Sequence, residues 1–181
     1  MKKVWYSIVA VAFLLPLSAS AADSAAVLDA KVAEAIAAFK EEVNGGDVFL
    51  RQAAGYLVFP RVIKVGIGIG AETGEGALRV AGRTAAYYRT TSGSFGLQLG
   101  AQAKSIVIAF MTKESLAAFR ASSGWQVGID GSVALIDLGA GKQINTKNIK
   151  DPVVGFIFGA KGLMYNLTLE GTKISRDHKD R

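Results

Sequence analysis

From residue 62 onward, apolar side chains alternate with glycine at a period of two, and this pattern constrains the fold more than any other feature. In residues 62–70, four β-branched side chains occupy one face of the predicted strand, and glycines occupy most of the other face. The alternation returns in residues 94–102. Glycine inside a strand costs conformational entropy and removes a packing side chain. Its repetition therefore predicts tight curvature, or the close approach of another layer of the protein.

Further strand patterns surround these two segments. Residues 56–59 form a brief apolar segment that Pro60 is expected to end. Additional strands are predicted over 75–80, 84–91, 105–111, 125–138, 153–158 and 163–174. We expect 75–80 and 84–91 to form a hairpin and 105–111 to be a central strand. The last two, 153–158 and 163–174, are expected to form a closing pair. Strands do not alternate with helices, so we expect an α+β fold. It has N-terminal helices packed on a strongly curved, glycine-rich antiparallel sheet or partial barrel, with one further helix near 112–121.

Two helices are predicted before the first strand, over residues 23–43 and 47–54. The first has an apolar stripe at steps of three and four, which is typical of a helix that covers a core: Leu28, Val32, Ile36, Phe39 and Val43. Its opposite face is acidic. Helices that lie in a membrane surface favour lysine and arginine on the polar face. The sequence therefore favours packing on the sheet over membrane insertion.

The N-terminus has the three parts of a secretory signal. Lys2 and Lys3 precede an apolar run over residues 4–17, and small residues at Ala19 and Ala21 form the cleavage pattern. The run is too short to span a bilayer as a helix. We expect cleavage near Ala21 and a periplasmic or secreted protein, with peripheral membrane association as an option.

The predicted organisation is a signal peptide over 1–21, a helical segment over 22–54, a glycine-rich β-domain over 55–175 that forms one domain with that segment, and a charged tail over 176–181. The chain has no cysteine, which excludes disulfides, thiolate metal sites and the lipid anchor of a bacterial lipoprotein.

No catalytic constellation is recognisable. The single histidine, His178, lies in the charged tail, where it lacks the fixed partner that acid–base catalysis needs. The glycines of residues 66–71 match a dinucleotide fingerprint in form only, because no helix follows them to receive a phosphate. No serine has the setting of a nucleophile elbow. We expect a protein that is not an enzyme, with no cofactor and no bound metal.

Charge is unevenly distributed along the chain. Residues 22–60 carry three basic and six acidic side chains, whereas residues 61–181 carry sixteen basic and nine acidic ones. A basic β-domain attracts anionic lipid or another polyanion. The simpler alternative is a mixed surface charge that keeps the protein in solution.

The order of these segments resembles the SYLF domain, the lipid-binding module of eukaryotic actin-regulatory proteins, which has many bacterial relatives. The resemblance extends from about Ala53 to Ser175, and five stretches carry it: 55–60 leading into the glycine strand to Gly70, 74–76, 95–102, the apolar strand to Met111, and 161–163 through 169–171. It implies a non-enzymatic domain that associates with membrane lipids. Eukaryotic members bind phosphoinositides through a basic amphipathic N-terminal helix, whereas the helix predicted here is acidic.

The sequence and the resemblance lead to one main functional hypothesis, an exported protein of the bacterial envelope that binds lipid or an anionic membrane surface. Basic groups near such a surface contribute about 1 kcal/mol each. The candidate lipid-binding residues are Arg61, Lys64, Lys104, Lys142, Lys147 and Lys150. The alternative is a structural or protein-binding envelope domain without a lipid ligand. Nucleic acid is not an expected partner.

Overall fold

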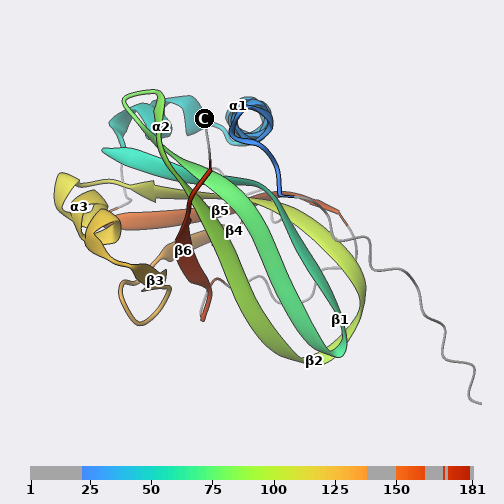
Figure 1. Cartoon of the computed structure of the whole chain (residues 1–181). Helices are drawn as coiled ribbons and strands as arrows, with labels where there is room; N and C mark the ends of the chain where they lie inside the picture. Colours follow the sequence, from blue (N-terminus) through green and yellow to red (C-terminus); the bar gives the residue numbers. More distant parts are fainter. Residues whose placement is uncertain (1–21, 138–149, 162–168, 170, 180–181) are drawn as a thin grey trace, which may run out of the picture.

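The computed structural model describes residues 22–137, 150–161, 169 and 171–179. Figure 1 shows its helices and strands, which follow one another in this order: α1 (Ala25–Glu42), α2 (Gly46–Gln52), β1 (Gly55–Val80), β2 (Arg83–Phe110), α3 (Lys113–Ala121), β3 (Gly124–Gln126), β4 (Ala134–Asp137), β5 (Val153–Lys161) and β6 (Lys173–Asp177).

The six described strands form one strongly curled sheet. Strands β1 and β2 make a long antiparallel hairpin that bends over near its middle, and Figure 1 shows the bend at the opposite end of the hairpin from α1 and α2. One half of β2 pairs with β6 and the other half pairs with β5, which gives the order β3-β6-β2-β5-β4. These pairings are antiparallel except for β4 with β5. The predicted α+β class with a curved sheet and a helix after the central strand is confirmed.

Glycines allow this curvature. A Cβ atom on Gly66 would lie 2.4 Å from the Cα of Gly70, because β1 folds back on itself there. A Cβ on Gly76 would lie 2.4 Å from the carbonyl oxygen of Val58, where the two halves of β1 approach each other. No real Cβ tolerates such contacts. The tight curvature expected at the glycines of residues 62–70 is confirmed at Gly66, and Gly76, outside that pattern, lies against a second layer.

The two faces of the sheet pack against different helices. One face carries Val58, Val107 and Phe156, and it packs against Phe39 of α1 and Phe49 of α2. Edge-on ring contacts join Phe156 to both helices, with centroids 5.1 Å and 5.0 Å apart.

The other face packs against α3. Phe119 of α3 stacks between Tyr88, Phe110 and Trp125, at centroid distances of 4.6 to 5.7 Å. Thr112 caps α3 by accepting a hydrogen bond from the backbone N–H of Ser115 at 3.1 Å. The helix predicted near 112–121 is confirmed.

Helix α1 covers the sheet as its apolar stripe predicts. Leu28, Val32 and Phe39 are fully buried, and Ser24 caps the helix by accepting a hydrogen bond from the N–H of Val27 at 3.4 Å. The alternative of an apolar face that inserts into a membrane is excluded for α1 in this fold, because that face is already in the core. Its exposed face carries Glu34, Glu41 and Glu42.

The structure corrects two strand predictions. Pro60 does not end the first strand: β1 continues through it at a register shift between Phe59 and Val62, where a residue without an N–H loses no ladder hydrogen bond. The segment 125–138 is not one strand, because a turn with a bridge from Val127 to Gly131 separates β3 from β4. The predicted closing pair of 153–158 with 163–174 stays a prediction, because most of its second strand lies outside the described residues; β5 and β6 both pair with β2.

The two ends of the described chain meet at Glu75. Its carboxylate accepts a hydrogen bond from the backbone N–H of Asp23 at 3.1 Å and pairs with Lys179 at 3.2 Å. The Lys179 ammonium also donates to the carbonyl oxygen of Asp23 at 2.6 Å. Residues 176–179 of the predicted charged tail are therefore anchored to β1.

Candidate functional site

The outward face of β1 at its bend exposes three apolar side chains. Ile63, Val65 and Ile69 have 37%, 50% and 68% of their surface accessible, and we call them the apolar strip. Arg61 lies at the head of the same face, exposed because the register shift at Pro60 turns Val62 inward. Side chains two residues apart share one face of a strand, so Arg61 and the strip form one continuous surface.

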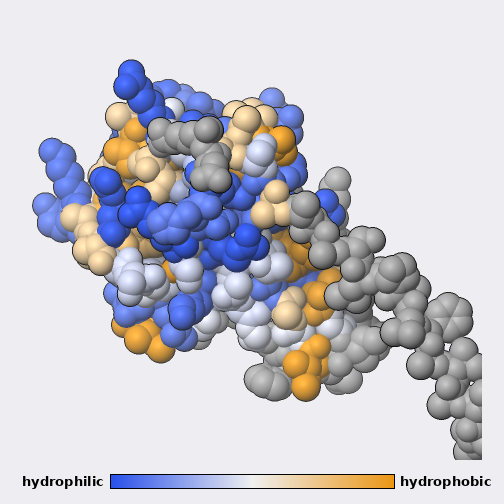
Figure 2. Space-filling model, viewed as in Figure 1, coloured by the Kyte–Doolittle hydropathy of each residue, from blue (hydrophilic) through white to orange (hydrophobic). Residues whose placement is uncertain are grey.

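The strip differs from the other exposed apolar residues of the described chain. Val27, Val48 and Ile129 are exposed singly on α1, α2 and the turn after β3. Scattered apolar residues of that kind are normal on protein surfaces, whereas a grouped set rimmed by polar residues marks an interaction site. Figure 2 shows hydrophobic surface at the bent end of the hairpin.

The predicted lipid-binding residues divide into three groups. Arg61 is exposed beside the strip, and Lys64 is half-buried on the opposite face of the same strand. Lys150 is exposed just before β5. Lys142 and Lys147 lie outside the described residues.

Lys104 belongs to a different environment. Its ammonium lies 3.0 Å from the Glu72 carboxylate, and both side chains are more than nine-tenths buried on the inward face of the bend. The ion pair joins two segments of the curled hairpin, and Glu72 neutralises the charge of Lys104 within the fold.

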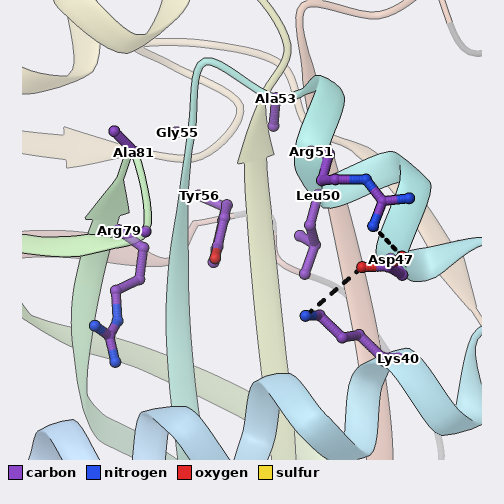
Figure 3. Close-up of a pocket in the computed structure, with 10 residues that line it drawn as sticks. Lys40, Asp47, Leu50, Arg51, Ala53, Gly55, Tyr56, Arg79 and Ala81 are labelled. Carbon is purple, nitrogen blue, oxygen red and sulfur yellow. Dashed lines mark hydrogen bonds and ion pairs between the residues drawn. The ribbon is translucent and has the colours of Figure 1, made fainter.

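A second surface feature lies at the other end of the hairpin, between the helices and the β1–β2 turn. Figure 3 shows Arg79 and Tyr56 extending from β1 towards α1, with Lys40, Asp47 and Arg51 gathered on the α2 side. Burial raises the pKa of the Tyr56 hydroxyl above its ordinary value, and the Arg79 charge partly opposes that rise.

Sequence reasoning missed this groove. A signal was present, since Arg79 is a charged residue two positions after Ala77 on a face that is otherwise apolar. That position has meaning only once α1 and α2 are known to cover the same face.

The described residues offer little for catalysis or metal binding. They hold no group of three or more histidine or acidic side chains that could ligate a metal. His178 is exposed at the end of the chain that the structure describes, beyond β6. Within that part of the chain, no helix combines the length and the apolar character needed to cross a bilayer.

Comparison with known families agrees with this architecture. A family model described as "Ysc84: Las17-binding protein actin regulator" matches residues 91–180, which include most of β2 and every later element. No curated protein matches the chain. The family model confirms the SYLF resemblance over residues 91–180. The chain belongs to the Ysc84 family, also called SYLF, a family of binding domains.

Proposed function

We propose that this protein is an exported, non-enzymatic component of the bacterial envelope that binds anionic membrane surfaces through the bend of the β1–β2 hairpin. The observation that carries the proposal is the apolar strip, with Arg61 at its head. Membership of a binding-domain family supports a binding role. The secretory pattern at the N-terminus supports export.

Two weak interactions contribute to membrane binding: burial of apolar side chains and electrostatic attraction of basic ones. Full burial of an isoleucine side chain contributes about 1.5–3 kcal/mol, and Ile69 has most of its surface available for that transfer. A basic side chain near an anionic leaflet adds about 1 kcal/mol. Burial of apolar surface is insensitive to salt. Salt does screen the electrostatic attraction, with a Debye length of about 8 Å at physiological ionic strength. Reversible, partly salt-dependent association is the expected behaviour.

The test is flotation of the purified protein with vesicles of phosphatidylglycerol and phosphatidylcholine, at low and high salt. We expect binding that increases with the phosphatidylglycerol fraction and decreases with salt. Arg61→Glu should weaken it about tenfold or more, because attraction is lost and repulsion is gained. Arg120→Glu makes the same charge change on the exposed surface of α3 and should leave binding unchanged. Equal effects of the two variants would contradict a role for Arg61.

A protein partner is the second candidate, because the family is described as Las17-binding, which names a protein as its ligand. The apolar strip suits a protein interface as well as a membrane. Capture of an envelope protein that persists after lipid is extracted, combined with no flotation on any vesicle, would favour this alternative.

A further inference from the structure

The groove between α1, α2 and the β1–β2 turn is centred on Arg79. Two adjoining hollows, of about 290 Å³ and 490 Å³, share Arg79 and Gly82 in their walls. Lys40, Arg51, Arg79 and Arg83 are the basic side chains among the described residues that line them, against two acidic ones. We call this region the Arg79 groove.

The Arg79 guanidinium has no counter-charge in the described part of the protein. Its Nε atom is shielded from solvent and has no hydrogen-bond acceptor there. Buried polar groups almost always have partners, and leaving one unsatisfied costs about 1–3 kcal/mol. Arg79 as a whole is only partly buried and lines both hollows, so the rest of its guanidinium is available to an acceptor supplied by a ligand.

The two acidic side chains of the groove are engaged with other donors. Asp29 accepts hydrogen bonds from the hydroxyls of Thr84 at 2.7 Å and Tyr87 at 3.0 Å. Asp47 pairs with Arg51 and with Lys40, the latter at 3.6 Å. The charge of Asp47 is therefore balanced by its cationic neighbours, whereas Asp29 keeps its charge and only its acceptor positions are used. Four basic against two acidic side chains still leave the groove with a net positive charge.

We propose that the Arg79 groove binds the phosphate group of a small anionic ligand, with the Arg79 guanidinium as its main donor. A guanidinium presents five N–H donors in a planar fork that matches two phosphate oxygens at once. The Tyr56 hydroxyl extends to the same side of β1 as Arg79 and supplies a further donor (Figure 3). Lys40 and Arg83 add charge at the two ends of the groove.

The position of the groove identifies the source of the phosphate. Figure 1 shows α1 and α2 at the end of the hairpin opposite to its bend, where the apolar strip lies. A molecule held on a membrane by the bend presents the Arg79 groove to water. The ligand is therefore a soluble phosphorylated compound and not the headgroup of the membrane that the strip contacts. The choice of a soluble ligand over a headgroup rests on the membrane proposal, whereas the phosphate site itself does not, so either can fail alone.

The test is calorimetric titration of the purified protein, without vesicles, with inorganic phosphate and with glycerol phosphate, at constant ionic strength. We expect one site, with Arg79→Gln weakening binding at least tenfold and Arg79→Lys giving an intermediate loss because it keeps the charge but not the fork. Tyr56→Phe should weaken binding several-fold. Arg120→Gln removes the same charge from α3, outside the groove, and should bind as the wild type does.

Thermal unfolding in phosphate-free buffer separates this role from a structural one. Arg79→Gln should unfold at or above the wild-type temperature, because it removes an unsatisfied buried donor. Added phosphate should raise the unfolding temperature of the wild type but not of Arg79→Gln. The proposal is overturned if the wild type binds neither phosphate compound, or if Arg79→Gln binds as well as the wild type. Binding of phosphatidic acid vesicles alone, with no soluble phosphate bound, would equally overturn it.

Discussion

The buried ion pair between Lys104 and Glu72 gives the most quantitative prediction of the structure. The two side chains are 9% and 7% exposed, and their charged atoms are 3.0 Å apart. Removing one partner leaves the other charge buried and uncompensated, which costs about 3–5 kcal/mol. A domain of this size is stable by about 5–15 kcal/mol. Lys104→Met or Glu72→Leu alone should therefore remove a large fraction of the free energy of unfolding.

The double variant should recover most of that loss. Replacing a buried ion pair by apolar side chains of similar volume is often neutral or stabilising. We expect Lys104→Met with Glu72→Leu to unfold within about 1 kcal/mol of the wild type, which corresponds to a coupling energy of about 5 kcal/mol or more.

Urea unfolding followed by circular dichroism measures the free energy of unfolding of the wild type, the two single variants and the double variant. Lys113→Met, at an exposed position of α3, is the control and should change stability by no more than about 0.5 kcal/mol. Single losses below about 1 kcal/mol, or losses that simply add in the double variant, would refute the reasoning.

Three further predictions concern the hairpin and its surroundings. Gly76→Ala should destabilise the fold by about 3 kcal/mol in urea unfolding, because its Cβ would meet the Val58 carbonyl oxygen at 2.4 Å; a loss below about 0.5 kcal/mol would contradict the close approach. Ala81 has φ of 49° in a two-residue turn with Gly82, so Ala81→Asn should stabilise the protein by about 0.5–1 kcal/mol, and a destabilised variant would argue against this turn. Burial raises the pKa of the Tyr88 hydroxyl above its ordinary value of 10.0, and the charges of Arg176 and Arg120 partly oppose that rise. The contribution of Tyr88 to the free energy of unfolding is therefore fully present below pH 10.0 and is lost as the pH rises through the folded-state pKa. Tyr88→Phe should reduce that alkaline loss of stability, and an unchanged pH profile would show that another group causes it.

Local features of the fold could be predicted from the sequence. The stripe of α1 and the cap at Thr112 depend on residues three and four positions apart, so the spacing alone reveals them. The curvature of the sheet was also predictable, since glycines repeat on one face where no side chain could fit.

Long-range features could not be predicted. The predicted strands at 62–70 and 75–80 belong to one bent strand, β1, because β2 continues beside them through the bend. Strand ends are set by the neighbouring strand, which a local pattern does not show. The pairing of Lys104 with Glu72 likewise requires the register of the whole hairpin.

The candidate site was predictable only in part. Arg61 was predicted as a basic residue, and the β-branched face of residues 62–70 was recognised, but nothing local indicates which face the fold leaves exposed. Lys104 and Arg61 have the same charge in the sequence, and burial alone distinguishes them. Arg79 gains its neighbours from α1 and α2, which are distant in the chain.

The central claim is that the bend of β1 enters a membrane, and site-specific fluorescence tests it most directly. Because the chain has no cysteine, Val65→Cys and Ile129→Cys each allow one environment-sensitive dye to be attached at an exposed position. With phosphatidylglycerol vesicles, the dye at residue 65 should shift to shorter wavelength and be quenched by lipid-borne spin labels, while the dye at residue 129 stays in water. An unchanged spectrum at residue 65 under conditions where the protein floats with vesicles would contradict the account.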